Sequence, residues 1–461
     1  MSDYGFESGP AGALGVYNLL KDAYYGTGGF FTGRYLYKHE RETNEAYAER
    51  CREAYYLNYF ESIVNALVDP VFKRRPLRDF KGPAEDFITA FSQDVDRAGT
   101  NIHDFMKEVA LHAKLYGVAF IVMDNRRMDA DDSRTRQDMM VNKDYPYVYC
   151  LDPEDVDSFG IDHTGALTYI RFHEISSVDD GAVKYRYVEF DRNGWRVTDE
   201  TEGASSGSYN LGRVPVIPLY SRLLKKKTIL PEPEFMSIAK VEQAIYNHCS
   251  WLSEILKKQT FPILTIPSLD QKDIVVGTNN AMGYDPMSSH EPAFIAPSSD
   301  PATTLREQVR SLAQSMYRMA SLSFITDIGN TNESGDARQW AFERTNQQLA
   351  NFAGQCAKAE NQMMQLFCRW IGLDAEYHVS YPDDFGIVDV AAELTQAQAV
   401  LDLQLTNAIK EEVLKKVVAA YCPNISDERF DELLEDVRES ENNKIYSEPL
   451  SPEPGEGMNN E

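Results

Sequence analysis

The clearest structural signal in the sequence is the stretch PEPEFMSIAKVEQAIYNHCSWLSEILKKQTFPILTIP, residues 231–267. Its apolar residues recur at three- and four-residue steps from Glu234 to Gln259, the pattern of an amphipathic helix. Pro231 and Pro233 precede this helix and Pro262 follows it, as expected at helix boundaries. At a rise of about 1.5 Å per residue the helix would be roughly 39 Å long, which is more than one small domain needs.

The segments that follow predict a return path beside this helix. The run from Phe261 to Pro267 has strand length, and we expect it to pair within a small β segment that ends near Pro301. A second helix is predicted from Ala302 to Ser321. The Gly- and Asn-rich stretch from Phe324 to Gly335 predicts a polar loop. The apolar stripe from Asp336 to Leu373, without a proline, predicts a helix of about 57 Å.

The N-terminal half combines helices with a mainly antiparallel β region, so the predicted fold class is α+β. One helical pattern runs from Glu40 to Val68 and is stopped by Pro70 and Pro76; another runs from Ile102 to Tyr116 and ends at Gly117. Strands are predicted at 118–123, 145–151, 167–173, 184–190, 195–198 and 214–219. The charged segment 129–144 is predicted to be a loop.

The charge argues against a protein that grips nucleic acid. The 461 residues include 46 basic and 72 acidic side chains, a net charge of −26. Proteins that bind phosphates by releasing counterions carry basic surface, so this chain should on average repel DNA and anionic membranes. No stretch reaches 18 apolar residues, as a transmembrane helix requires. The first residues lack the pattern of a secretory signal, and the six cysteines lack Cys-x-x-Cys spacing, which predicts reduced and mostly buried thiols.

A phosphate-loop-like pattern occurs near the N-terminus but departs from the motif. It reads Gly28-x-x-x-x-Gly33-Arg34-Tyr35, whereas the working motif has Lys and then Ser or Thr after the second glycine, and follows a strand. We interpret this region, rich in Gly, Tyr and Phe, as a flexible N-terminal arm. The turn-like Ser205-Ser206-Gly207-Ser208 likewise lacks the flanking pattern of a catalytic serine.

The metal-ligand patterns are also incomplete. The histidines form no zinc-protease pair, and His103 and His112 are interpreted as surface or core residues. A calcium loop starting at Asp155 would place Phe159 and Ala166 at ligand positions. We therefore predict no catalytic residue, no metal and no cofactor. The acidic clusters leave a metal-dependent nuclease open as an alternative if their carboxylates converge in space; they are Asp129/Asp131/Asp132, Asp152/Glu154/Asp155/Asp157 and Asp383/Asp384.

The order of these segments resembles that of the portal proteins of tailed bacteriophages, the head-to-tail connectors. The resemblance covers about residues 30–440. It is carried by Arg34-Tyr35-Leu36, Glu45-x-Tyr47-x-x-Arg50, Tyr56-Leu57-Asn58-Tyr59-Phe60-x-x-Ile63-Val64, Pro70-Val71-Phe72-Lys73-Arg74-Arg75-Pro76, Tyr116-Gly117-Val118-Ala119-Phe120-Ile121-Val122-Met123-Asp124, Pro231-x-Pro233-Glu234-Phe235, Thr260-Phe261-Pro262-Ile263-Leu264 and Glu333-Ser334-Gly335.

The resemblance implies a portal fold and a division of the chain into its parts. The wing, with helices, an antiparallel β region and the N-terminal arm, would be residues 1–228. The first stem helix would be 229–259, the clip 260–301 and the second stem helix 302–322. A tunnel loop at 323–335 would lead to the spine helix at 336–373. A helical crown at 374–440 and a disordered acidic tail at 441–461 would complete the chain.

The resemblance also implies a function without catalysis. Portals form rings, typically of twelve subunits, at one capsid vertex of the virion, and would be assembled in the host cytoplasm. Double-stranded DNA passes through the ring during packaging and ejection without sequence specificity. The implied partners are the terminase, capsid and scaffolding proteins, and head-completion or neck proteins, with no membrane.

Two groups of residues are candidates for these contacts. In the tunnel loop, Asp327, Asn330, Thr331, Asn332, Glu333 and Ser334 would face the DNA; the loop has no Lys or Arg, so it should touch DNA without gripping it. At the stem and clip the candidates are Lys257, Lys258, Phe261, Ile263 and Leu264. The alternatives are the packaging-associated metal-dependent nuclease and an unrelated ring-forming adaptor.

Overall fold

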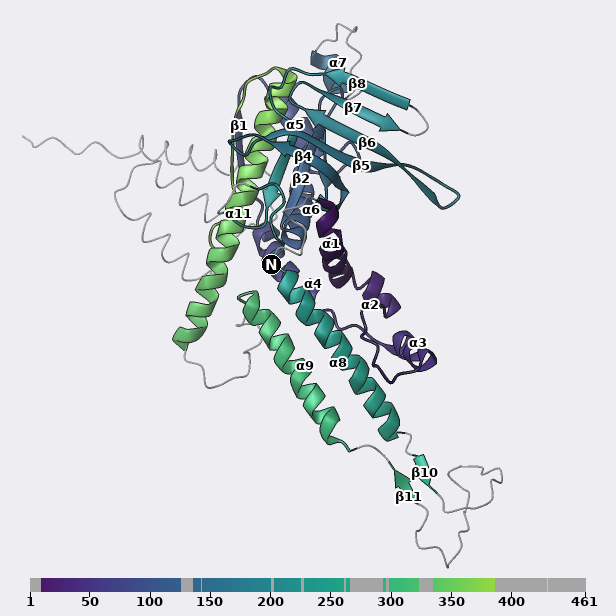
Figure 1. Ribbon diagram of the computed structural model, residues 1–461. Coiled ribbons are helices and arrows are strands. Elements are labelled where there is room, and N and C mark those ends of the chain that lie inside the picture. Colours follow the sequence, from purple (N-terminus) through teal and green to yellow (C-terminus); the bar gives the residue numbers. More distant parts are fainter. Residues whose placement is uncertain are drawn as a thin grey trace, which may run out of the picture.

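The computed structural model describes residues 10–125, 136–141, 143–199, 203–224, 228–260, 263–265, 293–295, 298–322, 335–385 and 429. These residues form an α+β fold, as predicted. A body of helices and antiparallel strands carries a long helical hairpin that projects away from it (Figure 1).

Most of the described helices come from the first third of the chain. The N-terminal ones are α1 (Pro10–Tyr25), α2 (Gly28–Thr32), α3 (Asn44–Glu53) and α4 (Tyr59–Lys73). They are followed by α5 (Glu85–Gln93), α6 (Ile102–Tyr116) and the short α7 (Arg136–Val141). The 37-residue helix α11 (Gly335–Ile371) runs along this body, and at about 1.5 Å per residue it is roughly 55 Å long.

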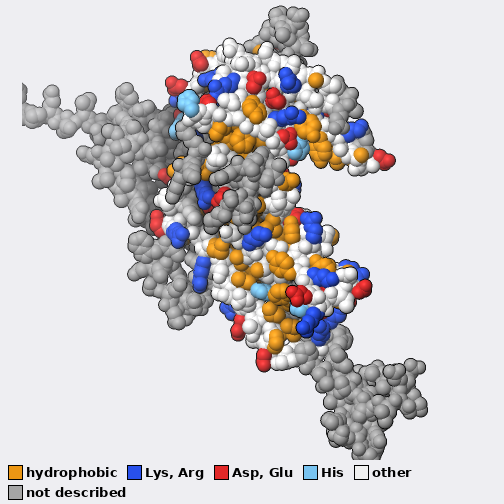
Figure 2. Space-filling view, in the orientation of Figure 1, with side chains coloured by type: hydrophobic (Ala, Val, Ile, Leu, Met, Phe, Trp, Pro, Cys, Tyr) orange, Lys and Arg blue, Asp and Glu red, His pale blue; other side chains and the backbone are white. Residues whose placement is uncertain are grey.

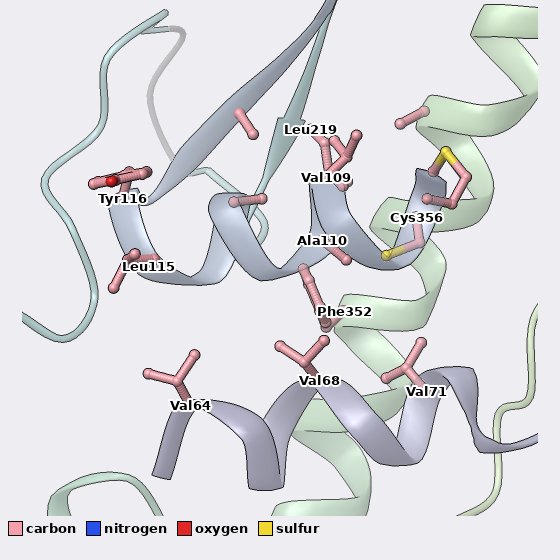
Figure 3. Close-up of a cluster of buried hydrophobic side chains, with 14 of the residues drawn as sticks. Val64, Val68, Val71, Val109, Ala110, Leu115, Tyr116, Leu219, Phe352 and Cys356 are labelled. Atoms are coloured by element: carbon pink, nitrogen blue, oxygen red, sulfur yellow. The ribbon is translucent and has the colours of Figure 1, made fainter. Parts of the chain in front are cut away.

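The helical core lies where α4, α6 and α11 meet. Figure 3 shows Val64 and Val68 of α4 facing α6, with Phe352 and Cys356 of α11 at the side. Helix α6 ends at Gly117, whose φ of 89° is a left-handed conformation that glycine adopts without strain. This confirms the predicted helix and its end.

Two sheets of three and five strands also belong to the body. The strands β3 (Tyr147–Leu151), β2 (Val118–Asp124) and β9 (Val216–Tyr220) form one sheet in that order, all antiparallel. The second contains, in order, β4 (Val156–Ile161), β5 (Leu167–Asp179), β6 (Ala182–Asp191), β7 (Gly194–Asp199) and β8 (Gly203–Ser208). A 3₁₀ turn, η1 (Pro153–Asp155), connects the two sheets.

Strand β2 explains how the layers fit together, because all seven of its residues are buried. Successive side chains in a strand point to opposite faces. Ala119, Ile121 and Met123 accordingly belong to the helical core. Val118, Phe120 and Val122 belong to a second core, which is shared with the five-stranded sheet.

The N-terminal segment is not a flexible arm, and that prediction was wrong for the described residues. Tyr17, Leu20 and Ala23 of α1 are fully buried, and α1 packs against α4, α6 and α8. The Gly-rich composition hid this periodicity. Residues 1–9 lie outside the described ranges.

The predicted helix from Glu40 to Val68 is two helices, and Pro70 does not stop it. Residues 54–58 separate α3 from α4, and the Asn58 side chain caps α4 by accepting a hydrogen bond from Glu61 N at 2.9 Å. Helix α4 continues through Pro70 to Lys73. Burial of Val71 and Phe72 offsets the backbone hydrogen bond that a proline cannot donate.

Two further predictions need correction. The segment 129–144 contains α7. The crown was predicted to be helical from residue 374, but Glu376–Ser380 form strand β12, which pairs antiparallel with β1 (Leu77–Lys81). Residues 386–461, which include most of the predicted crown and the acidic tail, lie outside the described residues, Arg429 excepted.

Strand β8 was misread as a turn because its sequence is GASSGS. Its glycines are explained by close packing. A Cβ at Gly194 would lie 2.3 Å from the Gly207 carbonyl oxygen, and a Cβ at Gly207 would lie 2.6 Å from the Trp195 indole nitrogen. Small residues therefore let this edge strand approach β7.

A buried ion pair fastens β1 and β12 to α11. The carboxylate of Glu360, which is inaccessible to solvent, accepts hydrogen bonds from Arg78 Nε at 2.7 Å, from Tyr377 at 2.6 Å and from Tyr381 at 2.7 Å. Each carboxylate oxygen thus has partners, which a buried charge requires.

Candidate functional site: the helical hairpin and its anchor

The projecting hairpin contains α8 (Met236–Thr260), β10 (Ile263–Thr265), β11 (Ala293–Ile295) and α9 (Asp300–Met319). The chain leaves the body along α8 and returns along α9, and the two helices pack against each other (Figure 1). Both predicted helices are confirmed, with ends within two residues. At the far end β10 pairs antiparallel with β11, which confirms the predicted strand over Ile263–Thr265; the other residues of 261–267 lie outside the described ranges.

The half of α8 nearest the body is anchored by polar contacts with the N-terminal segment. Asn247 accepts a hydrogen bond from Tyr37 N at 2.7 Å, and its Nδ2 donates to the carbonyl oxygen of Tyr35 at 3.0 Å. The Tyr246 hydroxyl donates to the Phe30 carbonyl oxygen at 2.8 Å. These side chains hold α2 and the loop that follows it against α8.

Arg50 of α3 completes the anchor. Its guanidinium donates to Glu42 through Nε at 2.8 Å and Nη2 at 2.7 Å, a bidentate pair. It also reaches the Tyr37 carbonyl oxygen at 2.8 Å and Ser250 Oγ of α8 at 3.2 Å. One nearly buried cation therefore joins α3, the loop before it and α8.

A buried carboxyl group, Glu242, lies within the same anchored half of α8. Its Oε1 accepts a weak hydrogen bond from Tyr59 N at 3.4 Å, whereas its Oε2 is buried without a hydrogen-bond partner among the described residues. Burial raises the pKa of Glu242 to about 8. The side chain is therefore mostly protonated at neutral pH.

The far half of α8 is exposed. No residue after Leu252 in this helix is buried, and the Leu256 side chain is 44% exposed. Trp251, Tyr55 and Leu57 are also exposed. Figure 2 shows apolar side chains at the surface of this lower region, where Figure 1 places α8, α3 and α2.

The two candidate lysines of the stem differ in their surroundings. Lys257 donates to Glu49 at 2.6 Å and to Glu53 at 3.1 Å, both on α3. Lys258 has a 67% exposed side chain and lies 4.0 Å from Glu254. Lys257 is thus already paired within its own chain, whereas Lys258 faces solvent.

The structure describes only some of the remaining candidate site residues. The backbones of Ile263 and Leu264 lie in β10, opposite Ile295 and Phe294. Phe261 and the six candidates of the tunnel loop, from Asp327 to Ser334, lie outside the described residues. Their proposed contacts with DNA or partners therefore stay predictions.

A second exposed apolar surface lies on the β5–β6 hairpin, which extends beyond β4 and β7 (Figure 1). Ile175 pairs with Tyr185, and Val178 pairs with Val183. Paired residues share a face, as do Val183 and Tyr185 two positions apart. An irregularity after Ile175 lets both β5 residues join them, so four exposed apolar side chains form one patch.

The phosphate-loop-like segment has the wrong environment for an anion. The Gly29 amide donates to the Asp22 carboxylate at 3.1 Å, and a Cβ at Gly28 would lie 2.1 Å from that carboxylate. The Tyr35 hydroxyl donates to Asp22 as well, at 2.7 Å. A protein carboxylate thus occupies the place that a phosphate would need.

The acidic cluster at residues 152–157 contacts histidine and lysine side chains. Asp152 lies 2.6 Å from His112 Nδ1, Glu154 lies 2.6 Å from Lys21 Nζ, and Asp157 lies 3.1 Å from His173 Nδ1. Asp155 is close enough to Asp152 and Glu154 that burial and their charges raise its pKa to about 6. The carboxylates therefore do converge, but around paired side chains.

Comparisons with known proteins identify no family. No protein-family model matches the chain, and no curated protein matches it. A chain from the neck of an empty GTA particle, computed with C6 symmetry, is 13% identical with a TM-score of 0.41, over 78% of this chain and 90% of that one. A chain from the neck of a native GTA particle, computed with C12 symmetry, is 12% identical with a TM-score of 0.38, over 77% and 89%. At these scores the likeness carries no argument.

Among the described residues, no helix has the length and apolar composition needed to cross a bilayer.

Proposed function

We propose that this chain is the subunit of a portal-type connector, a structural ring at one capsid vertex through which viral DNA enters and leaves. The proposal rests on the resemblance of the sequence and on one structural observation: the α8–β10–β11–α9 hairpin, which projects from an α+β body and is followed by the 37-residue helix α11. The hairpin would be stem and clip, and α11 the spine. The chain would have no catalytic activity of its own.

The exposed surfaces support assembly into a closed ring, for which we expect twelve copies. Leu256 and Trp251 on the hairpin, together with the four apolar residues of the β5–β6 patch, are exposed in the single chain. A heterologous contact, in which one surface meets a different surface of the next copy, closes into a ring with an axial hole. Such contacts would bury these apolar side chains.

The net charge of −26 suits a conduit for DNA. Each phosphate held by a cation adds affinity that must be broken as the DNA moves. On the described part of the hairpin, Lys257 is already paired with Glu49 and Glu53, so its charge is less available to hold a phosphate. The terminase, capsid and scaffolding proteins, and neck proteins would dock on the ring, in a virion assembled in the host cytoplasm.

Negative-stain imaging and native mass measurement of the purified chain test the proposal. We expect rings with a central hole and a mass near twelve times 52.3 kDa. A chain that stays monomeric across buffers and concentrations would contradict the proposal. Cleavage of DNA by the purified chain in the presence of divalent metal would instead favour the nuclease alternative.

A further inference from the structure

A set of three potential metal ligands lies where α6 faces the end of β3. His112 comes from α6, Cys150 is the penultimate residue of β3, and Asp152 follows that strand. One donor atom from each, nitrogen, sulfur and oxygen, lies within 4.8 Å of the other two. All three side chains are half-buried, and His112 and Asp152 are 40 residues apart, which is why sequence spacing did not indicate them.

The donor set matches the chemistry of zinc. Thiolate, imidazole and carboxylate are its protein ligands, with bonds of about 2.0–2.3 Å. Tetrahedral ligands with such bonds are about 3.3–3.8 Å apart, so the three donors need only small side-chain rotations. The present 2.6 Å contact between His112 Nδ1 and Asp152 is a hydrogen bond; a metal ion would take the place of its proton.

The surrounding charge favours a cation. Two further carboxylates lie beside the ligand set: Asp155 lines the same hollow as Cys150, and Glu108 lines the same hollow as His112. The nearby Lys21 is bound to Glu154. Glu108 is exposed and lies one helical turn before His112 in α6, on the same face of the helix. Its carboxylate, or a water molecule, is suited to a fourth position.

The site is accessible from solvent. Cys150 lines a surface hollow together with Asp155, His173 and Tyr185, at the base of the β5–β6 hairpin. His112 lines a second hollow beside α4, which Glu108 also lines. An ion can therefore reach both sides of the ligand set without unfolding of the core.

We propose that His112, Cys150 and Asp152 bind one zinc ion per chain and that this ion fastens α6 to the end of β3. The role is structural, because the ion would join α6, which belongs to the helical core, to β3, which belongs to the three-stranded sheet. The proposal does not depend on the portal function, because it concerns a single chain. It revises the expectation from sequence that the chain binds no metal.

Cobalt titration of the chelator-treated, full-length chain tests the site. We expect one equivalent of Co²⁺ to produce an ultraviolet thiolate-to-cobalt charge-transfer band and the visible bands of tetrahedral cobalt. Cys150→Ser should abolish the charge-transfer band, and His112→Ala should weaken binding by at least about 100-fold. Cys51→Ser is the matched control, because Cys51 is also a half-buried free thiol and should leave the spectrum unchanged.

Thermal unfolding separates a lost ligand from a lost fold. Zinc should raise the melting temperature of the wild type and of Cys51→Ser by several degrees, but not that of Cys150→Ser. Should Cys150→Ser fail to fold without metal, Asp152→Asn provides the same comparison with little change of volume. The absence of a thiolate–cobalt band in the wild type, or an undiminished band in Cys150→Ser, would overturn the proposal.

Discussion

The two halves of helix α8 have opposite surroundings. Between Ile238 and Leu252 the helix buries ten residues, and four of these are the polar side chains of Glu242, Gln243, Asn247 and Ser250. Beyond Leu252 it buries none, although Leu256 is apolar. One continuous helix is thus packed into the body at one end and exposed to solvent at the other.

The buried half of α8 should matter for the stability of the folded chain, and the exposed half for the assembly of several chains. Polar side chains in the anchored half fix the N-terminal loops through specific hydrogen bonds, whose loss leaves buried groups unsatisfied. The exposed half contributes little to the folded chain, and in the proposed ring its apolar residues would contact other copies. Substitutions in the two halves should therefore affect different measurements.

Matched aromatic substitutions should give the largest contrast. Tyr246→Ala removes a buried ring that packs on Phe30 and Tyr56 and should cost about 3–5 kcal/mol of unfolding free energy. Trp251→Ala, on the next turn but 39% exposed, should change it by less than about 1 kcal/mol. Urea unfolding of samples shown to be monomeric measures both; equal losses would remove the distinction between the two halves.

The buried Glu242 should make the anchored half sensitive to pH. Its pKa is raised from 4.5 to about 8, so the folded chain keeps a proton that the unfolded chain releases. Stability from this group should be greatest below pH 4.5, fall as the pH rises toward 8, and level off above that.

Glu242→Gln tests this pH dependence by removing the titration. We expect the variant to gain stability over the wild type at pH 8, by about 1.4 kcal/mol for each unit by which the pKa of Glu242 differs between the folded and the unfolded chain. Urea unfolding between pH 5 and pH 9 (roughly the window of the shift) measures this. Parallel pH profiles for the two chains would show that Glu242 is not responsible.

Lys257→Met should have the smallest effect. Its ion pairs with Glu49 and Glu53 are exposed, and such pairs add little to stability because water and salt screen them. We expect an unchanged urea midpoint for monomeric chain at low and at high salt. A clear destabilisation that disappears at high salt would mean that α3 depends on this lysine.

Dense apolar periodicity and clear end signals explain which elements could be predicted. Helices α6, α8 and α11 carry long apolar stripes, and they end before Gly117, Pro262 and Gly372 respectively. Apolar periodicity did not predict α1 or the GASSGS strand β8, because their glycine- and serine-rich sequences are typical of loops and turns. It also did not predict β1 and β12, since the pairing of Leu77 with Ser380 joins segments about 300 residues apart.

The anchor of α8 was missed for a different reason. This helix was predicted from its apolar stripe alone, whereas the polar residues Glu242, Gln243, Asn247 and Ser250 are buried as well. Their three- and four-residue spacing next to the apolar stripe was an available signal of a fully covered helix. The partners of these residues could not be predicted, because Arg50 and the loop at Tyr35–Tyr37 meet α8 only through tertiary packing.

Sedimentation velocity of two matched variants tests most directly whether the exposed half of α8 is an assembly surface. Leu256 on this half and Ile161 at the end of β4 are equally exposed, at 44%. We predict that Leu256→Asp converts rings to monomers with an unchanged circular-dichroism spectrum, whereas Ile161→Asp leaves the rings intact, because a charge buried at a subunit contact is costly. Intact rings in Leu256→Asp would contradict the account.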